Sequence, residues 1–141
     1  MMHLEEMTAA VELGRTGERE AARTQLTALW EACDDPQTRC AIAHYLADVQ
    51  DETEDELSWD LRALEDVEDD GWLPSLHLNL ADDYRRLSQT QLAEDHLSIA
   101  RGLLSGVPEG AYGDLIRSGV VHVAEALAAG SVRRLETNPS S

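Results

Sequence analysis

Residues 74–105 read PSLHLNLADDYRRLSQTQLAEDHLSIARGLLS, and this stretch decides the fold. Its apolar residues recur at helical spacing on both sides of a polar break at residues 88–91, which is typical of two amphipathic helices joined by a turn. Ala81 and Ala93 lie twelve residues apart, one on each side of that break. Because small side chains let paired helices approach closely, the stretch predicts a helical hairpin with Ala93 buried at the crossing.

The same stretch resembles a tetratricopeptide repeat, whose pattern runs W-x2-L-G-x2-Y, then A-x3-F, then P over about 34 residues. The matching positions are His77 at the Trp slot, Leu80 at Leu, Ala81 at Gly, Tyr84 at Tyr, Ala93 in its own slot, Leu97 at Phe, and Pro108 slightly beyond the expected Pro. The resemblance implies a helix–turn–helix unit in a right-handed superhelical stack that binds other proteins.

The first part of the chain fits the same frame. Ala10 and Ala22 are also twelve residues apart, so residues 3–36 are expected to form a first repeat. Gly14 is expected to take the left-handed position that ends the first helix of this repeat.

A second repeat is expected over residues 37–71. Pro36 suits the first turn of its first helix. Ala43 and Leu57 are fourteen residues apart, so the alignment of this repeat needs a two-residue insertion.

We therefore expect an all-α protein, with about three hairpins in a right-handed α-α superhelix that ends in a capping helix. The expected organisation is one domain over residues 1–129, with repeats at about 3–36, 37–71 and 74–107 and a cap at 110–129. The tail, residues 130–141, is expected to bury little and to be flexible. The alternative is a plain helical bundle whose Ala and Leu spacing imitates a repeat.

The charge of the chain restricts its partners. The 141 residues carry a net charge of −17, and all eleven basic residues are Arg. Such a surface repels phosphate backbones and anionic membranes, and it attracts basic segments. We therefore expect a protein or peptide partner, basic if charge selects it, and neither nucleic acid nor membrane. The alternative is that the charge serves only solubility.

The compartment and origin are also suggested by composition. The chain has no apolar run of about 18 residues, and its acidic, amphipathic start is unlike a signal peptide. These features predict a cytoplasmic protein. The absence of Lys beside abundant Ala, Arg and Leu is typical of a high-GC bacterial genome.

Acidic residues gather in residues 51–70, which hold eleven of the 28 carboxylates against one base, Arg62. The helix dipole favours acids at the start of a helix and disfavours them at its end. Five acids fall near the expected helix end, from Glu65 to Asp70. We call four of them the acidic face: Glu65, Asp66, Glu68 and Asp69. Their placement predicts a docking surface for a basic partner, and the alternative is a solvated outer helix.

Metal and catalytic signals are weak. Cys33, Cys40 and His44 could bring three ligands together, but without a Cys-x2-Cys pair they are better interpreted as two buried, reduced cysteines and a histidine. Residues 66–71 resemble the front half of a calcium loop, yet His77 stands where the bidentate Glu is needed. The usual motifs for nucleophilic, nucleotide-dependent and zinc chemistry do not occur. We therefore assign no catalytic, cofactor-binding or metal-binding residue, and we do not expect an enzyme.

The resemblance also assigns partner-binding positions, on the first helix of each hairpin, which lines the concave groove in the family. In this chain they are Met7, Val11, Gln37, His44, Ser75, Leu78, Asn79, Asp82, Arg85 and Arg86. The implied function is a non-catalytic adaptor or regulatory module that binds a protein segment in the groove. The alternatives are a structural module that forms a homodimer and an enzyme with an unrecognised acidic site.

Overall fold

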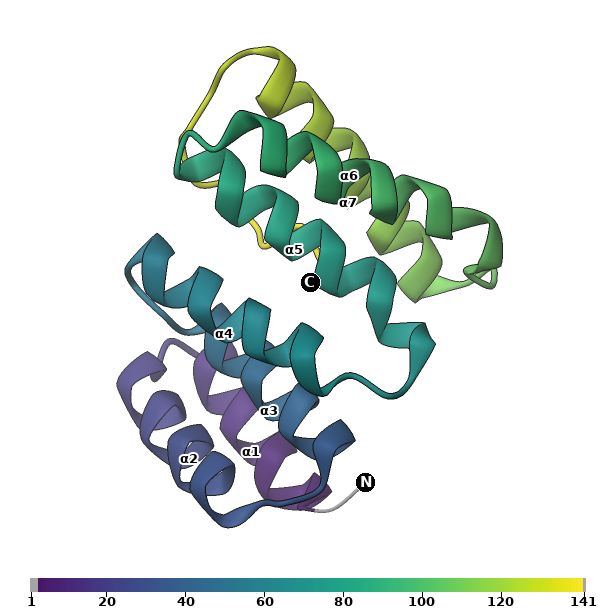
Figure 1. Cartoon of the computed structure of the whole chain (residues 1–141). Coiled ribbons are helices and arrows are strands. Elements are labelled where there is room, and N and C mark those ends of the chain that lie inside the picture. Colours follow the sequence, from purple (N-terminus) through teal and green to yellow (C-terminus); the bar gives the residue numbers. More distant parts are fainter. Residues whose placement is uncertain (1–2, 141) are drawn as a thin grey trace. The chain divides into compact units, whose positions relative to one another are not determined.

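The computed structural model describes residues 3–140, in which all regular secondary structure is helical (Figure 1). The α-helices are α1 (Leu4–Arg15), α2 (Arg19–Ala32), α3 (Pro36–Asp48), α4 (Thr53–Asp66), α5 (Leu73–Arg86), α6 (Thr90–Leu103) and α7 (Ala111–Ala128), with short 3-10 turns η1 (Asp70–Trp72) and η2 (Leu104–Gly106). The prediction of an all-α fold is confirmed. Within this described part of the chain, no helix combines the length and the apolar character that crossing a membrane requires.

The helices group into two compact units. Unit 1 is Met1–Asp69 and contains α1 to α4, and unit 2 is Asp70–Ser141 and contains α5 to α7. The sequence led us to expect one domain over residues 1–129. The boundary lies where the second and third repeats were expected to meet, and apolar side chains are buried on both sides of it.

Unit 1 consists of the hairpins α1/α2 and α3/α4. Ala10 and Ala22 are fully buried where α1 meets α2. Arg19 and Arg23 on α2 then join the two hairpins, because they donate to the backbone oxygens of Gln50 (2.9 Å) and Val49 (2.7 Å) in the turn before α4. These bonds satisfy carbonyls that the end of α3 leaves without helical partners.

The other end of unit 1 is held by Arg39 on α3. Its Nη1 donates to the backbone oxygens of Trp30 (2.9 Å) and Cys33 (3.0 Å), and its guanidinium lies 3.6 Å from the centre of the Trp30 ring. Trp30 in turn meets Trp59 of α4 edge to face, with ring centres 5.1 Å apart. One arginine and two indoles therefore connect α2, α3 and α4.

The start of α3 was predicted correctly from the sequence, and the end of α1 was predicted incorrectly. Pro36 begins α3, as predicted, and the carboxylate of Asp35 accepts from the Thr38 amide at 3.0 Å to cap it. Gly14 was the wrong residue for the end of the first helix: α1 continues to Arg15, and Gly17 takes the left-handed conformation with φ of 94°. A Cβ on Gly14 would lie 3.1 Å from Val49, so this glycine serves close packing instead.

Unit 2 contains the hairpin α5/α6, with α7 packed against both of its helices. Ala81 and Ala93 are fully buried, as the hairpin prediction required. The core that joins the three helices contains Leu78, Ala81, Leu97, Ala100, Ile116, Val120 and Val123.

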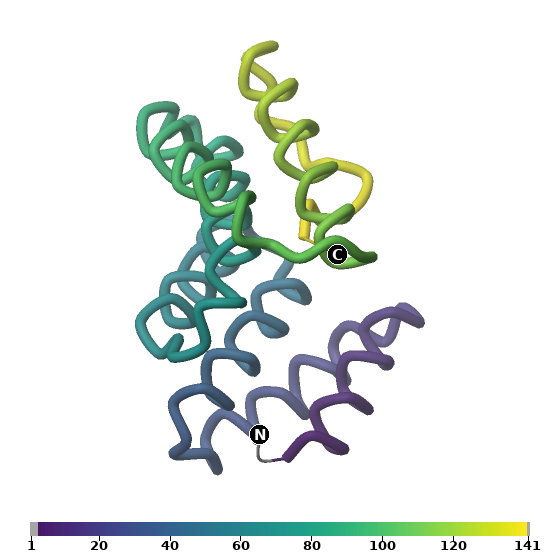
Figure 2. Tube along the Cα trace, turned by 90° about the vertical axis from the view of Figure 1, so that its right-hand side faces the viewer, coloured from purple at the N-terminus to yellow at the C-terminus, as the bar shows by residue number. Residues whose placement is uncertain are grey.

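The segment after α7 is also part of unit 2 (Figures 1 and 2). Residues 130–141 were expected to bury little, but Leu135 packs against the core and Pro139 is buried. The chain reverses at Gly130, whose φ is 68°, and then runs back beside α5 and α7. Composition alone did not reveal this, because the segment has few apolar residues besides Leu135 and Pro139.

The turns of hairpins α1/α2 and α5/α6 close in the same way. The backbone amide of Glu18 donates to the backbone oxygen of Leu13, and that of Gln89 donates to the backbone oxygen of Tyr84, each at 2.8 Å. This bond is the outer bond of a Schellman motif. Gly17 occupies the left-handed position of the first turn, but Ser88, with φ of 60°, occupies that of the second.

Ser88→Gly is therefore expected to stabilise the protein, by up to about 1 kcal/mol, because a left-handed conformation strains a side chain but not glycine. Ser98→Gly is the matched control, since Ser98 is exposed within α6 and glycine there should lower stability by several tenths of a kcal/mol. Urea unfolding followed by circular dichroism measures both. Equal effects of the two substitutions would show that the Ser88 turn stores no strain.

Candidate functional site

Four charged residues on α5 neutralise one another inside unit 2. Arg85 donates to Oδ1 of Asp82 through Nε (3.1 Å) and Nη2 (2.7 Å). Arg86 reaches Oδ2 of Asp82 at 3.1 Å and Oδ1 of Asp83 at 3.0 Å. All four side chains are at most 5% exposed, so the two positive and two negative charges balance where water does not screen them.

Arg85 also holds the segment after α7. Its remaining nitrogen, Nη1, donates to the backbone oxygen of Ser131 at 2.8 Å. Arg85 is itself only 2% exposed, so this arginine is committed to partners within its own unit.

The partner-binding positions assigned by resemblance are mostly covered. Seven are buried, with at most 8% exposure: Met7, His44, Ser75, Leu78, Asn79, Asp82 and Arg85. Val11 and Gln37 are half-buried, and Arg86 is half-buried as a residue although its side chain is only 4% exposed. A buried side chain meets a partner only after its cover moves. The role of these residues in binding stays a prediction, and Gln37 is the one for which the structure shows a link to an exposed surface.

Gln37, on the first turn of α3, fixes the loop that carries half of the acidic face. Its Oε1 accepts from the backbone amides of both Glu68 and Asp69 at 2.8 Å. The Glu68 and Asp69 side chains are exposed, as is Glu65 in the last turn of α4. Asp66, the fourth member, is half-buried and faces Arg39 at 3.6 Å. Three of the four carboxylates therefore face solvent from a backbone that is held in place.

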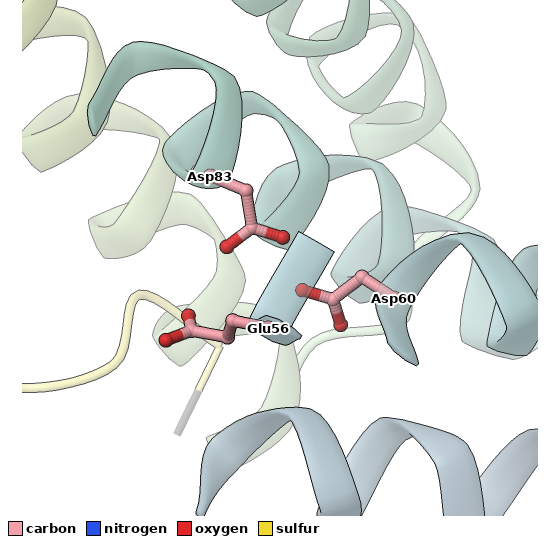
Figure 3. A group of neighbouring side chains, drawn as sticks. All are labelled: Glu56, Asp60 and Asp83. Atoms are coloured by element: carbon pink, nitrogen blue, oxygen red, sulfur yellow. The ribbon is translucent and has the colours of Figure 1, made fainter. Parts of the chain in front are cut away.

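A second group of acids, buried in unit 1, was not identified from sequence. Glu56 and Asp60, on successive turns of α4, are 3% and 1% exposed, and Figure 3 shows their side chains. Figure 3 also labels Asp83, which belongs to the charge network of unit 2 described above. At the end of α3, burial together with the nearby charges of Asp60 and Glu56 holds the pKa of Asp48 well above its usual range, against the opposing effect of Arg19 and Arg15.

Glu56 and Asp60 occupy helix positions that hold buried apolar residues in the other two hairpins. The fourth and eighth residues of α2 are Ala22 and Leu26, and those of α6 are Ala93 and Leu97, all buried apolar residues. The fourth and eighth residues of α4 are Glu56 and Asp60. A frame counted from the start of each helix would have located them, whereas the predicted insertion placed Leu57 in the core slot.

Two histidines in unit 2 form a direct pair across the hairpin. Nδ1 of His77 on α5 lies 3.0 Å from Nδ1 of His96 on α6, and the Tyr84 ring stacks on His96 with centres 5.5 Å apart. Such a bond needs one nitrogen to donate and the other to accept, so the pair cannot carry a proton on both facing atoms. Burial lowers the pKa of both rings; charge on His96 lowers that of His77 further, and Asp95 opposes the shift at His96.

Cys33, Cys40 and His44 are buried, and Cys40 and His44 are held in their neutral forms. Cys33 and Cys40 are free and buried. Burial and the neighbouring Asp66 raise the pKa of Cys40 to about 12, so it remains a thiol at neutral pH. Burial lowers the pKa of His44 to about 4, which keeps its ring neutral. These residues fit the interpretation as packed core groups.

Comparison of the chain with protein-family models, with curated proteins and with solved structures found no match. The tetratricopeptide resemblance therefore rests on the sequence pattern alone. The side-chain geometry within each unit is the remaining guide to function.

Asp48→Asn is expected to stabilise the protein at pH 7. The raised pKa means that the charged carboxylate costs most stability above the folded-state pKa, and that the cost declines as the pH falls from there towards the ordinary carboxyl pKa. We expect a gain of about 1–3 kcal/mol at neutral pH, the scale of a close like-charge contact in partly buried surroundings, and this gain should shrink steadily as the pH is lowered. Urea unfolding across pH 4–7 measures it. Asp55→Asn, at an exposed site in the first turn of α4, is the control and should not stabilise.

The histidine pair predicts the opposite response to acid in unit 2. Because the folded-state pKa values are lowered, the stability from the neutral pair is complete above the ordinary pKa of about 6.5 and is lost as the pH falls below it. His96→Gln should flatten this dependence between pH 7.5 and 5, whereas His122→Gln, at an exposed site on α7, should not. Thermal unfolding, with NMR titration of the ring protons, tests it. Ordinary titration of both rings would show that the pair does not form in solution.

Proposed function

We propose that this protein is a non-catalytic interaction module that binds a basic segment of another protein on the acidic face. The observation that carries the proposal is the double hydrogen bond from the Glu68 and Asp69 amides to Gln37, because it holds an exposed acidic loop in one conformation. The two bonds satisfy backbone amides of the loop, and they also present its carboxylates in one arrangement. Preorganisation of this kind lowers the entropy lost on binding.

The charges of the acidic face support the same proposal. Glu65 and Asp66 lie in the last turn of α4, where the helix dipole disfavours carboxylates, and no basic residue lies in that turn. Asp66 faces Arg39 at 3.6 Å. Carboxylates at the end of a helix interact unfavourably with its dipole, so their presence in this turn is more readily explained by a basic partner than by folding.

We further propose that hairpins α1/α2 and α5/α6 are repeats of the tetratricopeptide kind. Their support is the matching Schellman turns and the matching buried alanines, Ala22 and Ala93, at the fourth position of the second helix. Two buried free thiols fit a protein of the reducing cytoplasm. A superhelical arrangement of the hairpins is part of this proposal.

The acidic face is tested with a fluorescent arginine-rich peptide as probe. Combined Glu65→Gln, Glu68→Gln and Asp69→Asn should weaken binding about threefold to a hundredfold at low salt, mostly through slower association, because exposed charges contribute about 0.2–1 kcal/mol each. The difference should shrink at high salt. Association is measured by stopped-flow anisotropy.

The matched control removes three exposed acids elsewhere in unit 1, by Glu5→Gln, Glu12→Gln and Glu20→Gln. Equal weakening by both variants would mean that the peptide responds to net charge, and the acidic face would lose its role. Gln37→Ala leaves the charge unchanged and should also weaken binding, because the loop is then no longer fixed. An unchanged affinity for Gln37→Ala would argue against preorganisation.

A further inference from the structure

The segment after α7 is attached to unit 2 at three points, beginning with its backbone. Gly130, in the left-handed conformation, reverses the chain, and Ser131 donates to the Ala126 oxygen at 2.9 Å. Nη1 of Arg85 then binds the Ser131 oxygen at 2.8 Å. We call residues 131–140 the strap. Because the Arg85 bond is made to a main-chain oxygen in the turn that ends α7, it does not depend on the side chain at position 131.

The second point is apolar. Leu135 of the strap packs against the core that contains Leu78 and Ala81 of α5 and Ile116 of α7. It lies between exposed residues on both sides, Arg134 and Glu136, so a single leucine anchors the middle of the strap. This is how an extended peptide typically occupies a surface: one side chain enters, and its neighbours stay in solvent.

The third point is a close backbone approach at Gly119 of α7. A Cβ on Gly119 would lie 2.1 Å from the Pro139 oxygen and 2.7 Å from Cδ2 of Leu78, so only glycine leaves room for the strap. Pro139 is buried, and Asn138 accepts from both the amide and the hydroxyl of Ser140 at 3.0 Å, which turns the chain as it leaves this point. Gly119 therefore leaves space for the backbone of the strap, and Arg85 donates a hydrogen bond to it.

We propose that the strap is a displaceable occupant of a peptide-binding surface on α5 and α7, and that an extended segment of another protein with the same leucine–proline spacing replaces it. The strap has no helix or strand of its own. One of its attachments is a hydrogen bond to a main-chain oxygen, and another is the close approach of a main-chain oxygen to Gly119, so neither depends on a side chain of the strap. This surface lies in unit 2 and is independent of the acidic face.

The experiment opens the surface in the full-length chain with Leu135→Ser and Pro139→Ser and adds the strap back as a labelled synthetic peptide, SVRRLETNPS, residues 131–140. We expect the opened chain to bind the peptide at least about tenfold more tightly than wild type, because a strap that is closed nine-tenths of the time lowers apparent affinity by that factor. The same peptide with Ala at its Leu and Pro positions has equal charge and should not bind. Fluorescence anisotropy measures each pair.

Two further variants distinguish the surfaces. Gly119→Ala in the opened chain should abolish peptide binding, because the methyl group takes the place of the Pro139 oxygen. The acidic-face substitutions, added to the opened chain, should leave its affinity for the peptide unchanged. If instead peptide affinity follows the acidic face, the signal is charge attraction, and the strap proposal is wrong.

Folding is checked on the same samples by circular dichroism and thermal unfolding. An opened chain that keeps its helicity but does not bind the peptide would overturn the proposal, because the surface would then not accept a segment in trans. An opened chain that unfolds would also overturn it, since a displaceable strap must be dispensable for folding. Concentration-dependent dimerisation of the opened chain with an intact second copy would support binding in trans.

Discussion

Close approach of paired helices at alanine is the constraint on which the packing of each unit depends. Ala10 and Ala22 in unit 1, and Ala81 and Ala93 in unit 2, are fully buried. A chain with no Phe and 4% aromatic residues cannot fill wide gaps between helices, so its helices have to lie close together. Each close pair then exposes one apolar side, against which α3 packs in unit 1 and α7 packs in unit 2. The local sequence of a hairpin thereby determines what must pack on it.

Features of the fold that arise from neighbouring residues could be predicted from sequence, whereas features that arise from distant ones could not. Helical periodicity, the start of α3 at Pro36 and the burial of Ala93 are local consequences of residue type and spacing. The division into two units and the packing of residues 131–140 depend on contacts between distant segments. Leu135 could not be recognised as a core residue, because nothing near it in sequence shows which surface it meets.

The candidate sites follow the same division. The acidic face could be located because charge is visible in the sequence, and its exposure agrees except at Asp66. Glu56 and Asp60 were included in a solvated run, because an acid in a core position is indistinguishable by composition from an acid on the surface. The pair His77 and His96 was missed because its partners are nineteen residues apart and meet only when the hairpin closes. A frame anchored at helix starts would have corrected the first error but not the second.

The two proposed surfaces are linked by how their backbones are held. Gln37 accepts from two amides of the acidic loop, and Arg85 donates to a carbonyl of the strap. Both residues stand at positions that the family resemblance assigns to binding a partner's polypeptide. In this protein they bind the protein's own backbone, and each does so at the edge of a surface with a distinct chemistry, acidic in unit 1 and apolar in unit 2. In both units a side chain therefore fixes a non-helical segment through its backbone. Under the two proposals, that segment presents charge to a partner in unit 1 and occupies the place of a partner in unit 2.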